Sequence, residues 1–233
     1  MLAILQARMS STRLPGKVMR PLLGAPMIGR QIERLRRSRR LDRILLATST
    51  GAEDDVLAAY VAGLGVPVHR GSLTDVMARF EGALAAAGTP SGFVRLTGDC
   101  PLADPDVIDA VIAHHQAGSY DYTSNTAEWT YPKGLDVEVV QTDAFARACA
   151  ATDSPYDHEH VTPYLYAHPE LFRIGRLQQS PPQRWRWTVD TPEDFAFVTA
   201  VYEALHPTEP DFRMADILAW QAAHPDRVLI NAV

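Results

Sequence analysis

The chain has 233 residues, of which 46% are hydrophobic and 21% are charged, a composition typical of one soluble globular domain. Its formal net charge of −6 argues against a nucleic-acid partner, because nucleic-acid-binding surfaces are basic. Two cysteines, Cys100 and Cys149, suit a reducing cytoplasm, and no apolar run could span a bilayer, so we expect a cytoplasmic protein without membrane insertion.

Short apolar runs alternate with amphipathic stretches through the first half of the chain. Runs such as "LAILQA" and "RILLATS" have the length of buried strands, and the stretches between them have helical spacing. Buried strands that alternate with helices build a parallel sheet covered on both faces, which predicts an α/β sandwich. We expect strands at 2–7, 43–49, 66–71 and 92–98, and helices at 26–38, 53–65, 74–88 (capped by Thr74) and 104–118.

The pattern changes after Tyr120, where polar and aromatic residues alternate as they do in antiparallel strands. We expect residues 120–187 to form an antiparallel excursion that binds an acceptor and supports dimerisation, within a single domain spanning 1–233. The further elements expected are helices at 142–151, 156–168, 191–206 and 212–224, strands at 172–178 and 184–190, and an apolar tail at 227–233.

The stretch "QARMSSTRLPGK" forms the loop after the first strand. In an open parallel sheet, ligands bind beyond the carboxyl ends of the strands, so this loop is the first candidate site. Its cations, hydroxyls and tight turns suit the phosphates of a nucleotide, while a solvated basic loop is the alternative on charge alone. It has neither a Walker A pattern nor a dinucleotide fingerprint. The nucleotide-binding candidates here are Ala7, Arg8, Ser10, Ser11, Arg13, Gly16 and Lys17.

Two aspartates each follow an apparent strand, Asp99 in "RLTGDCPL" and Asp190 in "RWTVDTPED". A divalent cation shared with a triphosphate needs a few rigidly held carboxylates, so both are candidate metal ligands. The alternative for Asp99 is a turn or helix cap. "DTPED" is also a helix-start signal, although Thr191 could be the cap and leave Asp190 free.

The stretch "YPKGLDVEV" places Asp136 and Glu138 on one face of a strand, because side chains two residues apart point to the same side. They could bind a polar acceptor, and an exposed strand face is the alternative. In "DHEHVTPY", His160 could bind the acceptor or merely pack. His158 and His160 do not share a helix face, so we expect no zinc pair there.

The loop "QARMSSTRLPGK" resembles the signature of the CTP-using synthetases that activate 3-deoxy-manno-octulosonate and sialic acids. It is more similar to the cytidylyltransferase family of the spore coat polysaccharide biosynthesis protein F type. That resemblance extends through "EDD", "RLTGDCPL", "YDYTSNT", "YPKGLDVEV", "EHVTPY" and "VDTPED" in the same order. The sequence departs from the signature at Ser10 or Ser11, where glycine is common, and at Val18, where the classical synthetases have asparagine.

The resemblance implies a mononucleotide-binding, Rossmann-like three-layer sandwich of the nucleotide-diphospho-sugar transferase type, with a mostly parallel sheet. It implies transfer of CMP from CTP to a small anionic sugar in surface-polysaccharide biosynthesis, with release of pyrophosphate, and a homodimer. It also implies that Asp99 and Asp190 ligate Mg²⁺, and that Ser72 and Asp75 lie near the nucleotide. Within this reading we expect the catalytic residues to be Arg8, Arg13, Lys17 and Asp99.

Two alternatives remain open. A nucleotide-sugar-dependent glycosyltransferase would need an Asp-X-Asp pair for its metal, and the nearest, at Asp104 and Asp106, begins a helix and contains proline. A non-catalytic nucleotide-sugar-binding protein would be favoured by loss of Lys17, Asp99 or Asp190, and all three are present.

Overall fold

The computed structural model describes residues 1–225, so the apolar tail predicted at 227–233 lies outside the described residues. Within residues 1–225 the chain forms a seven-stranded sheet and a two-stranded ribbon of β2 (Pro21–Leu22) and β3 (Ala25–Pro26). The strand order of the large sheet is β5 (Val68–Gly71), β4 (Arg43–Ser49), β1 (Leu2–Gln6), β6 (Gly92–Thr97), β8 (Glu138–Gln141), β7 (Tyr122–Ser124) and β9 (Ile174–Arg176).

Strand β1 lies in the interior of the sheet and is parallel to both of its neighbours, β4 and β6. Leu5 pairs with Leu46 of β4 and with Leu96 of β6. Strand β8 is antiparallel to β6 and β7, and β9 is parallel to β7. The predicted mostly parallel sheet with an antiparallel excursion is therefore confirmed.

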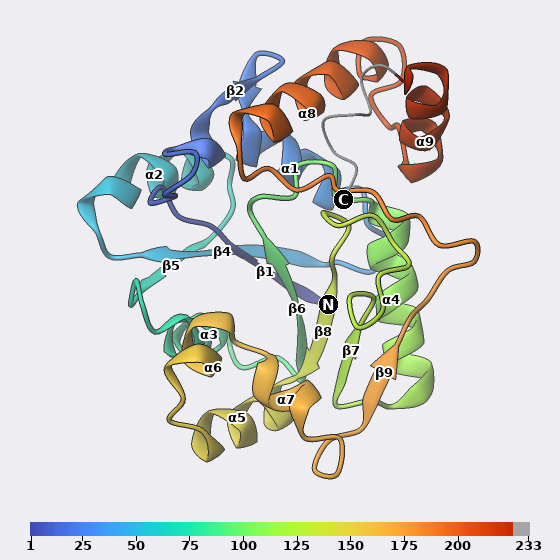
Figure 1. Cartoon of the computed structure of the whole chain (residues 1–233). Helices are drawn as coiled ribbons and strands as arrows, with labels where there is room; N and C mark the ends of the chain where they lie inside the picture. The colour runs from blue at the N-terminus through green and yellow to red at the C-terminus, as the bar shows by residue number, and fades with distance from the viewer. Residues whose placement is uncertain (226–233) are drawn as a thin grey trace.

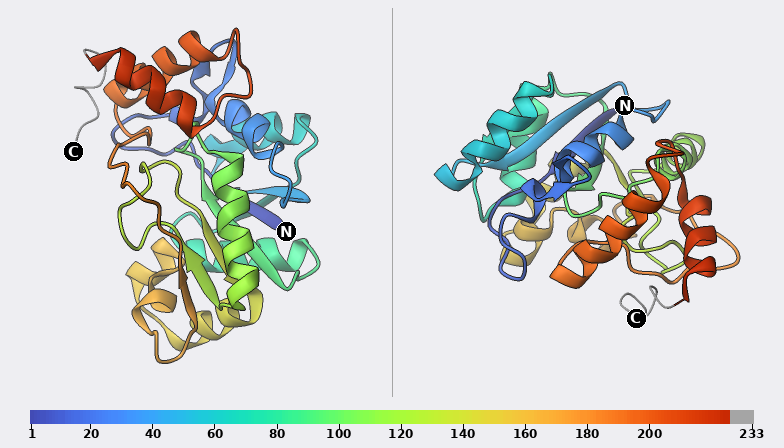
Figure 2. Two further views of the ribbon diagram at one scale, coloured as in Figure 1. Left: turned by 90° about the vertical axis from the view of Figure 1, so that its right-hand side faces the viewer. Right: turned by 90° about the horizontal axis from the view of Figure 1, so that it is seen from above.

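Helices cover both faces of the sheet. Successive side chains of β1 point to opposite faces, so they pack into two separate cores. Ala3 and Leu5 belong to the core formed with α1, α2, α4, α8 and α9, and Leu2 and Ile4 to the core formed with α3, α5 and α7. Figures 1 and 2 show α8 and α9 at one end of the molecule and α5–α7 at the other. The three-layer sandwich is thus confirmed. The helices are α1 (Met27–Leu35), α2 (Asp55–Gly63), α3 (Val76–Ala86), α4 (Pro105–Gly118), α5 (Thr142–Ala151), α6 (Pro155–His160), α7 (Pro163–Ala167), α8 (Pro192–Leu205) and α9 (Met214–Ala223).

No helix within residues 1–225 has both the length and the apolar character needed to cross a membrane. Two short 3₁₀ turns, η1 (Lys17–Met19) and η2 (Ala52–Asp54), complete the described elements.

Three local predictions differ from the structure. The strand predicted at 184–190 is extended but forms no ladder, since the Trp187 N–H donates to Lys133 and the Val189 N–H donates to Asp99. The helix predicted at 156–168 divides into α6 and α7 at Val161, whose φ of 76° interrupts it. Helix α3 is capped by the carboxylate of Asp75 instead of Thr74.

The carboxyl ends of β1 and β6 bring the opening loop against the segment that contains Asp99. The Gly98 N–H donates to the Gln6 carbonyl at 2.8 Å. A Cβ atom at Gly98 would lie 2.7 Å from the Ala7 Cβ, so only glycine permits this close approach. The sheet therefore places both candidate loops at one edge, as the topology predicts.

Candidate active site

The loop after β1 is held in a compact turn by its own backbone and by Asp54. The N–H groups of Ser11 and Gly16 donate to the Met9 carbonyl, each at 3.0 Å, and Gly16 has a φ of 67° that favours glycine. The Met9 N–H donates to Asp54 Oδ1 at 2.6 Å. Burial alone would raise the pKa of Asp54, but hydrogen bonds from Ser49 and Met9 outweigh it and lower that pKa. Asp54 therefore stays ionised and fixes the loop.

A cavity of about 290 Å³ lies between this loop and the ends of β1 and β6. The Ser10 hydroxyl beside it is shielded from solvent and has no hydrogen-bond partner within residues 1–225, which leaves it able to donate to a bound oxyanion. We call this space the loop cavity. It brings together these predicted site residues: Ala7, Arg8, Ser10, Ser11, Arg13, Lys17, Asp99 and Asp190.

Asp99 and Asp190, far apart in sequence, converge on the ammonium group of Lys17. Lys17 Nζ lies 3.0 Å from Asp190 Oδ1 and 3.6 Å from Asp99 Oδ2, and it donates to the Val189 carbonyl at 2.7 Å. The Thr97 hydroxyl donates to Asp99 Oδ1 at 2.6 Å. The carboxylates that the sequence analysis singled out therefore flank one cation.

Asp190 is held by further cations on both of its oxygens. Arg13 Nη2 lies 3.1 Å from Asp190 Oδ1, and Arg186 Nη2 donates to Oδ2 at 2.8 Å. Partial burial would raise the pKa of Asp190, but the charges of Lys17, Arg13 and Arg186 outweigh it and keep that pKa below its ordinary value. Arg186 is itself fixed by Asp194, which accepts two of its N–H groups at 3.0 Å each.

The donor set of the loop cavity fits a divalent cation that is shared with a nucleotide. Mg²⁺ is usually held by one or two carboxylates, with substrate phosphates and water completing its octahedral shell. Asp99 and Asp190 supply such a pair. No group of three or more His, Cys, Asp or Glu side chains in the described part of the chain is arranged to hold an ion. Oxygens of a bound substrate and water would complete the coordination of such an ion.

The remaining nucleotide-binding candidates lie outside the loop cavity. Gly16 shapes the loop, as described above. Ser72 Oγ accepts the Asp75 N–H at 3.0 Å, and Asp75 Oδ1 accepts the Ala78 N–H at 2.8 Å. Asp75 borders a neighbouring cavity together with Arg8 and His158. The side chains of Ser72 and Asp75 therefore hydrogen-bond to backbone N–H groups at the start of α3, and Asp75 also borders this neighbouring cavity.

His158 joins α6 to the start of α3. Its Nδ1 lies 2.9 Å from Asp75 Oδ1 and its Nε2 lies 3.1 Å from the Thr152 carbonyl. Both ring nitrogens thus face acceptors, and only the imidazolium form donates to both. The pKa of His158 is accordingly raised, first by the hydrogen bond to Asp75 and then by the one to Thr152.

We expect His158→Gln to destabilise the protein more at low pH than at high pH. Because the folded-state pKa of His158 exceeds the unfolded value, its stabilisation is complete below the ordinary histidine pKa of about 6.5 and is lost as the pH rises through the folded pKa. Urea denaturation at about pH 5.5 and about pH 8.5 measures the difference. In an Asp75→Asn background the same substitution should show a smaller pH dependence, because only the Thr152 carbonyl then favours the imidazolium. An equal loss at both pH values in the native background would contradict the ion pair.

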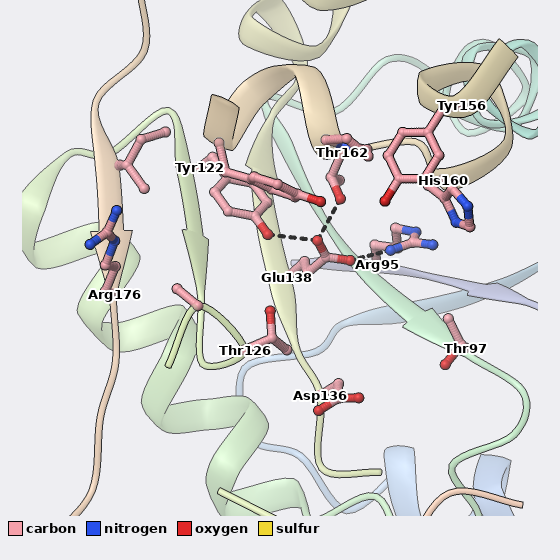
Figure 3. Close-up of a pocket in the computed structure, with 14 residues that line it drawn as sticks. Arg95, Thr97, Tyr122, Thr126, Asp136, Glu138, Tyr156, His160, Thr162 and Arg176 are labelled. Carbon is pink, nitrogen blue, oxygen red and sulfur yellow. Dashed lines mark hydrogen bonds and ion pairs between the residues drawn. The ribbon is translucent and has the colours of Figure 1, made fainter. Parts of the chain in front are cut away.

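A second cavity, of about 600 Å³, adjoins β6, β7 and β8 (Figure 3). We call it the acceptor cavity. It is lined by all three predicted acceptor residues, Asp136, Glu138 and His160, and its walls include aromatic side chains as well as cations. Thr97 lines both this cavity and the loop cavity, so the two spaces are neighbours. The aromatic and cationic residues of the lining are Tyr122, Tyr156, Tyr166, Arg95 and Arg176.

Glu138 lies at the centre of a hydrogen-bonded group in the acceptor cavity (Figure 3). One oxygen accepts the hydroxyls of Tyr122 and Thr162, each at 2.6 Å, and the other is paired with Arg95. Arg95 also donates to Gln6 Oε1 at 3.2 Å, and Gln6 lines the loop cavity. Both oxygens of Glu138 already have protein partners, so Glu138 shapes the wall of the acceptor cavity. Through Arg95 and Gln6 it is also linked to the loop cavity.

Three other side chains are better placed to face a ligand. The pKa of Asp136 is raised to about 6, chiefly by burial and further by repulsion from Asp99 and Glu138. Arg176 borders the cavity from the edge strand β9 and forms no ion pair within residues 1–225. The ring of His160 lies 4.4 Å, centroid to centroid, from that of Tyr156.

The Asp-X-Asp pair that a glycosyltransferase would need, Asp104 and Asp106, lies at the start of α4, where Asp104 has a structural role. Asp104 is buried and caps α4 by accepting the Asp106 N–H at 2.8 Å. Its other oxygen accepts the Met214 N–H at 2.6 Å, at the start of α9. The prediction that this stretch is a helix cap is confirmed.

Sequence reasoning missed Asp54, Arg95 and Arg186, which hold the site in shape. Asp54 and Arg95 act on residues that only the fold brings near, Met9 and Glu138 respectively. Arg186 acts on Asp190 and Asp194, which follow it within a few residues. The signal that could have found Arg95 is a charged residue within the otherwise apolar strand "GFVRLTG".

Comparison with known proteins assigns the family. A sequence profile described as "Cytidylyltransferase" matches residues 2–208. Spore coat polysaccharide biosynthesis protein SpsF of Bacillus subtilis (strain 168) is 36% identical, over 97% of this chain and 95% of its own length. A cytidylyltransferase structure from Leptospira borgpetersenii serovar Hardjo-bovis (strain JB197) is 28% identical, with a TM-score of 0.91 over 97% of this chain and 96% of that one. A CMP:2-keto-3-deoxy-manno-octonic acid synthetase complexed with CTP shares the fold, with a TM-score of 0.66, 17% identity, and coverage of 87% of this chain and 98% of that one. The chain therefore belongs to the cytidylyltransferase family and is a nucleotidyltransferase.

Proposed function

We propose that the protein transfers CMP from CTP to a sugar acid or a related acceptor in surface-polysaccharide biosynthesis and releases pyrophosphate. The main support is the pair of adjoining cavities, one cationic with two carboxylates and one polar and aromatic, which share Thr97. The fold relative named for CMP:2-keto-3-deoxy-manno-octonic acid synthesis was solved with CTP. The relative SpsF is named for polysaccharide biosynthesis.

In this proposal the triphosphate of CTP occupies the loop cavity. Arg8 and Arg13 contact phosphate oxygens, and Lys17 neutralises charge that develops on the departing pyrophosphate. The Ser10 and Ser11 hydroxyls and the Ala7 backbone complete the nucleotide contacts. Because little covalent chemistry falls to the protein, most of its rate enhancement comes from positioning and charge neutralisation.

The acceptor lies in the second cavity with a hydroxyl directed at the α-phosphorus. That oxygen forms a new bond to the α-phosphorus as the bond to the β-phosphate bridging oxygen breaks, so CMP is transferred and pyrophosphate leaves with the electron pair. Asp136 accepts the hydroxyl proton, since a pKa of about 6 leaves it ionised at neutral pH and a stronger base than an ordinary aspartate. Arg176 and His160 contact the acceptor's charged and polar groups.

Asp99 and Asp190 would hold a divalent cation of the Mg²⁺ type beside the phosphates. When bound, such a cation supplies Lewis-acid neutralisation of the phosphate oxygens.

Arg176→Gln should raise the KM for the acceptor by about 10- to 100-fold, the usual cost of losing a charge-assisted hydrogen bond, and leave the KM for CTP unchanged. Steady-state kinetics with each substrate varied in turn measures both constants. Arg173→Gln is the matched control, because Arg173 lies on the same segment but its guanidinium donates to the Gly118 carbonyl at 2.7 Å. An equal rise in both KM values would show that Arg176 does not act on the acceptor.

We further propose that residues 1–233 act as one nucleotidyltransferase domain in which 120–187 supplies acceptor contacts and a homodimer interface. Large apolar side chains are exposed on this excursion, with Tyr156 at 59%, Tyr166 at 46% and Leu171 at 52%. A monomer at micromolar concentration in a size measurement would contradict the dimer.

The experiment for the transfer itself uses CTP labelled at the α-phosphate and a panel of sugar acids with Mg²⁺. The proposal predicts that pyrophosphate is released and that the label becomes attached to an acceptor. Release of a nucleoside diphosphate from a nucleotide sugar, with no use of any triphosphate, would instead indicate glycosyl transfer.

A further inference from the structure

The ammonium group of Lys17 has the surroundings of a bound metal ion. Three oxygens face it: Asp190 Oδ1 at 3.0 Å, Asp99 Oδ2 at 3.6 Å and the Val189 carbonyl at 2.7 Å. Carboxylate and backbone carbonyl oxygens are also the ligands that hard divalent cations prefer. The Lys17 side chain is only 12% exposed, so its charge is well desolvated in this position.

The charges around this position are already balanced without a metal. Three carboxylates, of Asp99, Asp190 and Asp194, face three cations, of Lys17, Arg13 and Arg186. Both oxygens of Asp190 have cationic partners. A divalent cation added alone would therefore give this group of six side chains a net positive charge of about two, with no additional negative charge to offset it.

We infer that Lys17 occupies the place of the divalent cation until a nucleoside triphosphate binds, so that the metal enters with or after the nucleotide. The triphosphate supplies the negative charge that is lacking and offers oxygens to Lys17 and Arg13. A lysine ammonium on its flexible stem can turn from Asp190 to a phosphate. Asp190 then loses two of its three cationic partners and gains freedom to bind the metal. This inference rests on the proposed function, because it takes Asp99 and Asp190 as the metal ligands.

The direct test is a titration of the protein with Mn²⁺ in the absence of nucleotide. The electron paramagnetic resonance signal of free Mn²⁺ measures how much of the ion is bound. We expect weak binding to the native protein and a gain of at least about tenfold in affinity for Lys17→Met, because a positive charge about 4 Å away strongly repels a cation even near a protein surface. Adding Asp190→Asn to Lys17→Met should abolish the gain. Equal Mn²⁺ affinity for native protein and Lys17→Met would overturn the inference.

The chain offers a matched control and a second measurement, because its lysines are Lys17 and Lys133 alone. Lys133 lies over the Trp129 ring, 4.3 Å from the centroid, and Lys133→Met should bind Mn²⁺ as the native protein does. In native protein with isotope-labelled lysine, CTP without metal should shift the side-chain resonance of Lys17, and Mg²⁺ without CTP should not. This measurement is made on the native protein. Lys133→Met is used only to decide which of the two lysine resonances belongs to Lys17.

The outcomes separate this inference from the proposed function. If CTP stabilises the native protein but leaves the Lys17 resonance unchanged, the displacement of Lys17 is wrong and the nucleotide assignment stands. If Lys17→Met gains Mn²⁺ affinity but no nucleotide binds the native protein, the cation site stands and the cytidylyltransferase assignment fails.

Discussion

Replacing Lys17 with methionine should lower the turnover of CTP by about 10²- to 10³-fold, the effect of removing one preorganised group that stabilises transition-state charge. Lys17 lines the loop cavity with Arg8 and Arg13, and its ammonium is only 12% exposed. Methionine retains the length of the side chain and its packing but has no charge to offer the departing pyrophosphate. Pyrophosphate release at saturating CTP and Mg²⁺ measures the change.

Lys133→Met provides the comparison for that experiment. Lys133 lies over Trp129 outside the loop cavity, so the same substitution there should leave turnover within about twofold of the native rate, as is usual for surface changes. A loss of less than about tenfold for Lys17→Met would mean that Lys17 does not act on the transition state.

Replacing Asp194 with alanine should lower the free energy of unfolding by about 3 kcal/mol, because Arg186 loses one of its two carboxylate partners and two backbone N–H groups lose their acceptor. The Asp194 side chain is 3% exposed and accepts two N–H groups of Arg186 at 3.0 Å each. It also accepts the backbone N–H groups of Asp190 and Thr191, at 2.8 and 2.9 Å, at the start of α8. Alanine leaves all four donors without this acceptor.

Denaturant unfolding measures this loss, and Asp216→Ala is its control. Asp216 holds the equivalent position at the start of α9, where it accepts the Arg213 N–H at 2.7 Å. It forms no ion pair in the described part of the chain, so its removal should cost only about 1 kcal/mol, as for other helix caps. Similar losses for the two variants would contradict a special role for the Arg186–Asp194 pair.

We also expect Asp194→Ala to weaken CTP binding, since Arg186 would no longer be fixed beside Asp190.

The fold could be predicted well in the first half of the chain because strand and helix signals there are local. Strand β1, for example, is apolar from Leu2 to Leu5, as expected for a strand with neighbours on both sides and helices on both faces. The segment 184–190 has the alternation of a strand, yet its backbone hydrogen bonds go to two separate segments, at Lys133 and Asp99. Such pairing depends on distant parts of the chain, which periodicity does not report.

The same distinction applies to the site. The position of Lys17 and Asp99 after the ends of β1 and β6 could be predicted, because topology alone brings the ends of parallel strands to one edge. Asp190 follows a segment outside the sheet, and it reaches the same cavity because the Val189 N–H donates to the Asp99 carbonyl. The acceptor cavity was harder to predict, since Glu138 meets Arg95 and Thr162 only in the folded chain. The sequence left open whether Glu138 binds an acceptor or lies on an exposed strand face; the structure buries it and gives both of its oxygens protein partners.

Thermal unfolding with each nucleoside triphosphate, with and without Mg²⁺, shows which nucleotide the native protein and Asp99→Asn bind. A ligand that binds only the folded state raises the unfolding temperature by mass action. We expect CTP with Mg²⁺ to raise the Tm more than UTP, ATP or GTP does, and Asp99→Asn to weaken this shift. Protection by a nucleoside diphosphate sugar, with none by any triphosphate, would contradict this expectation.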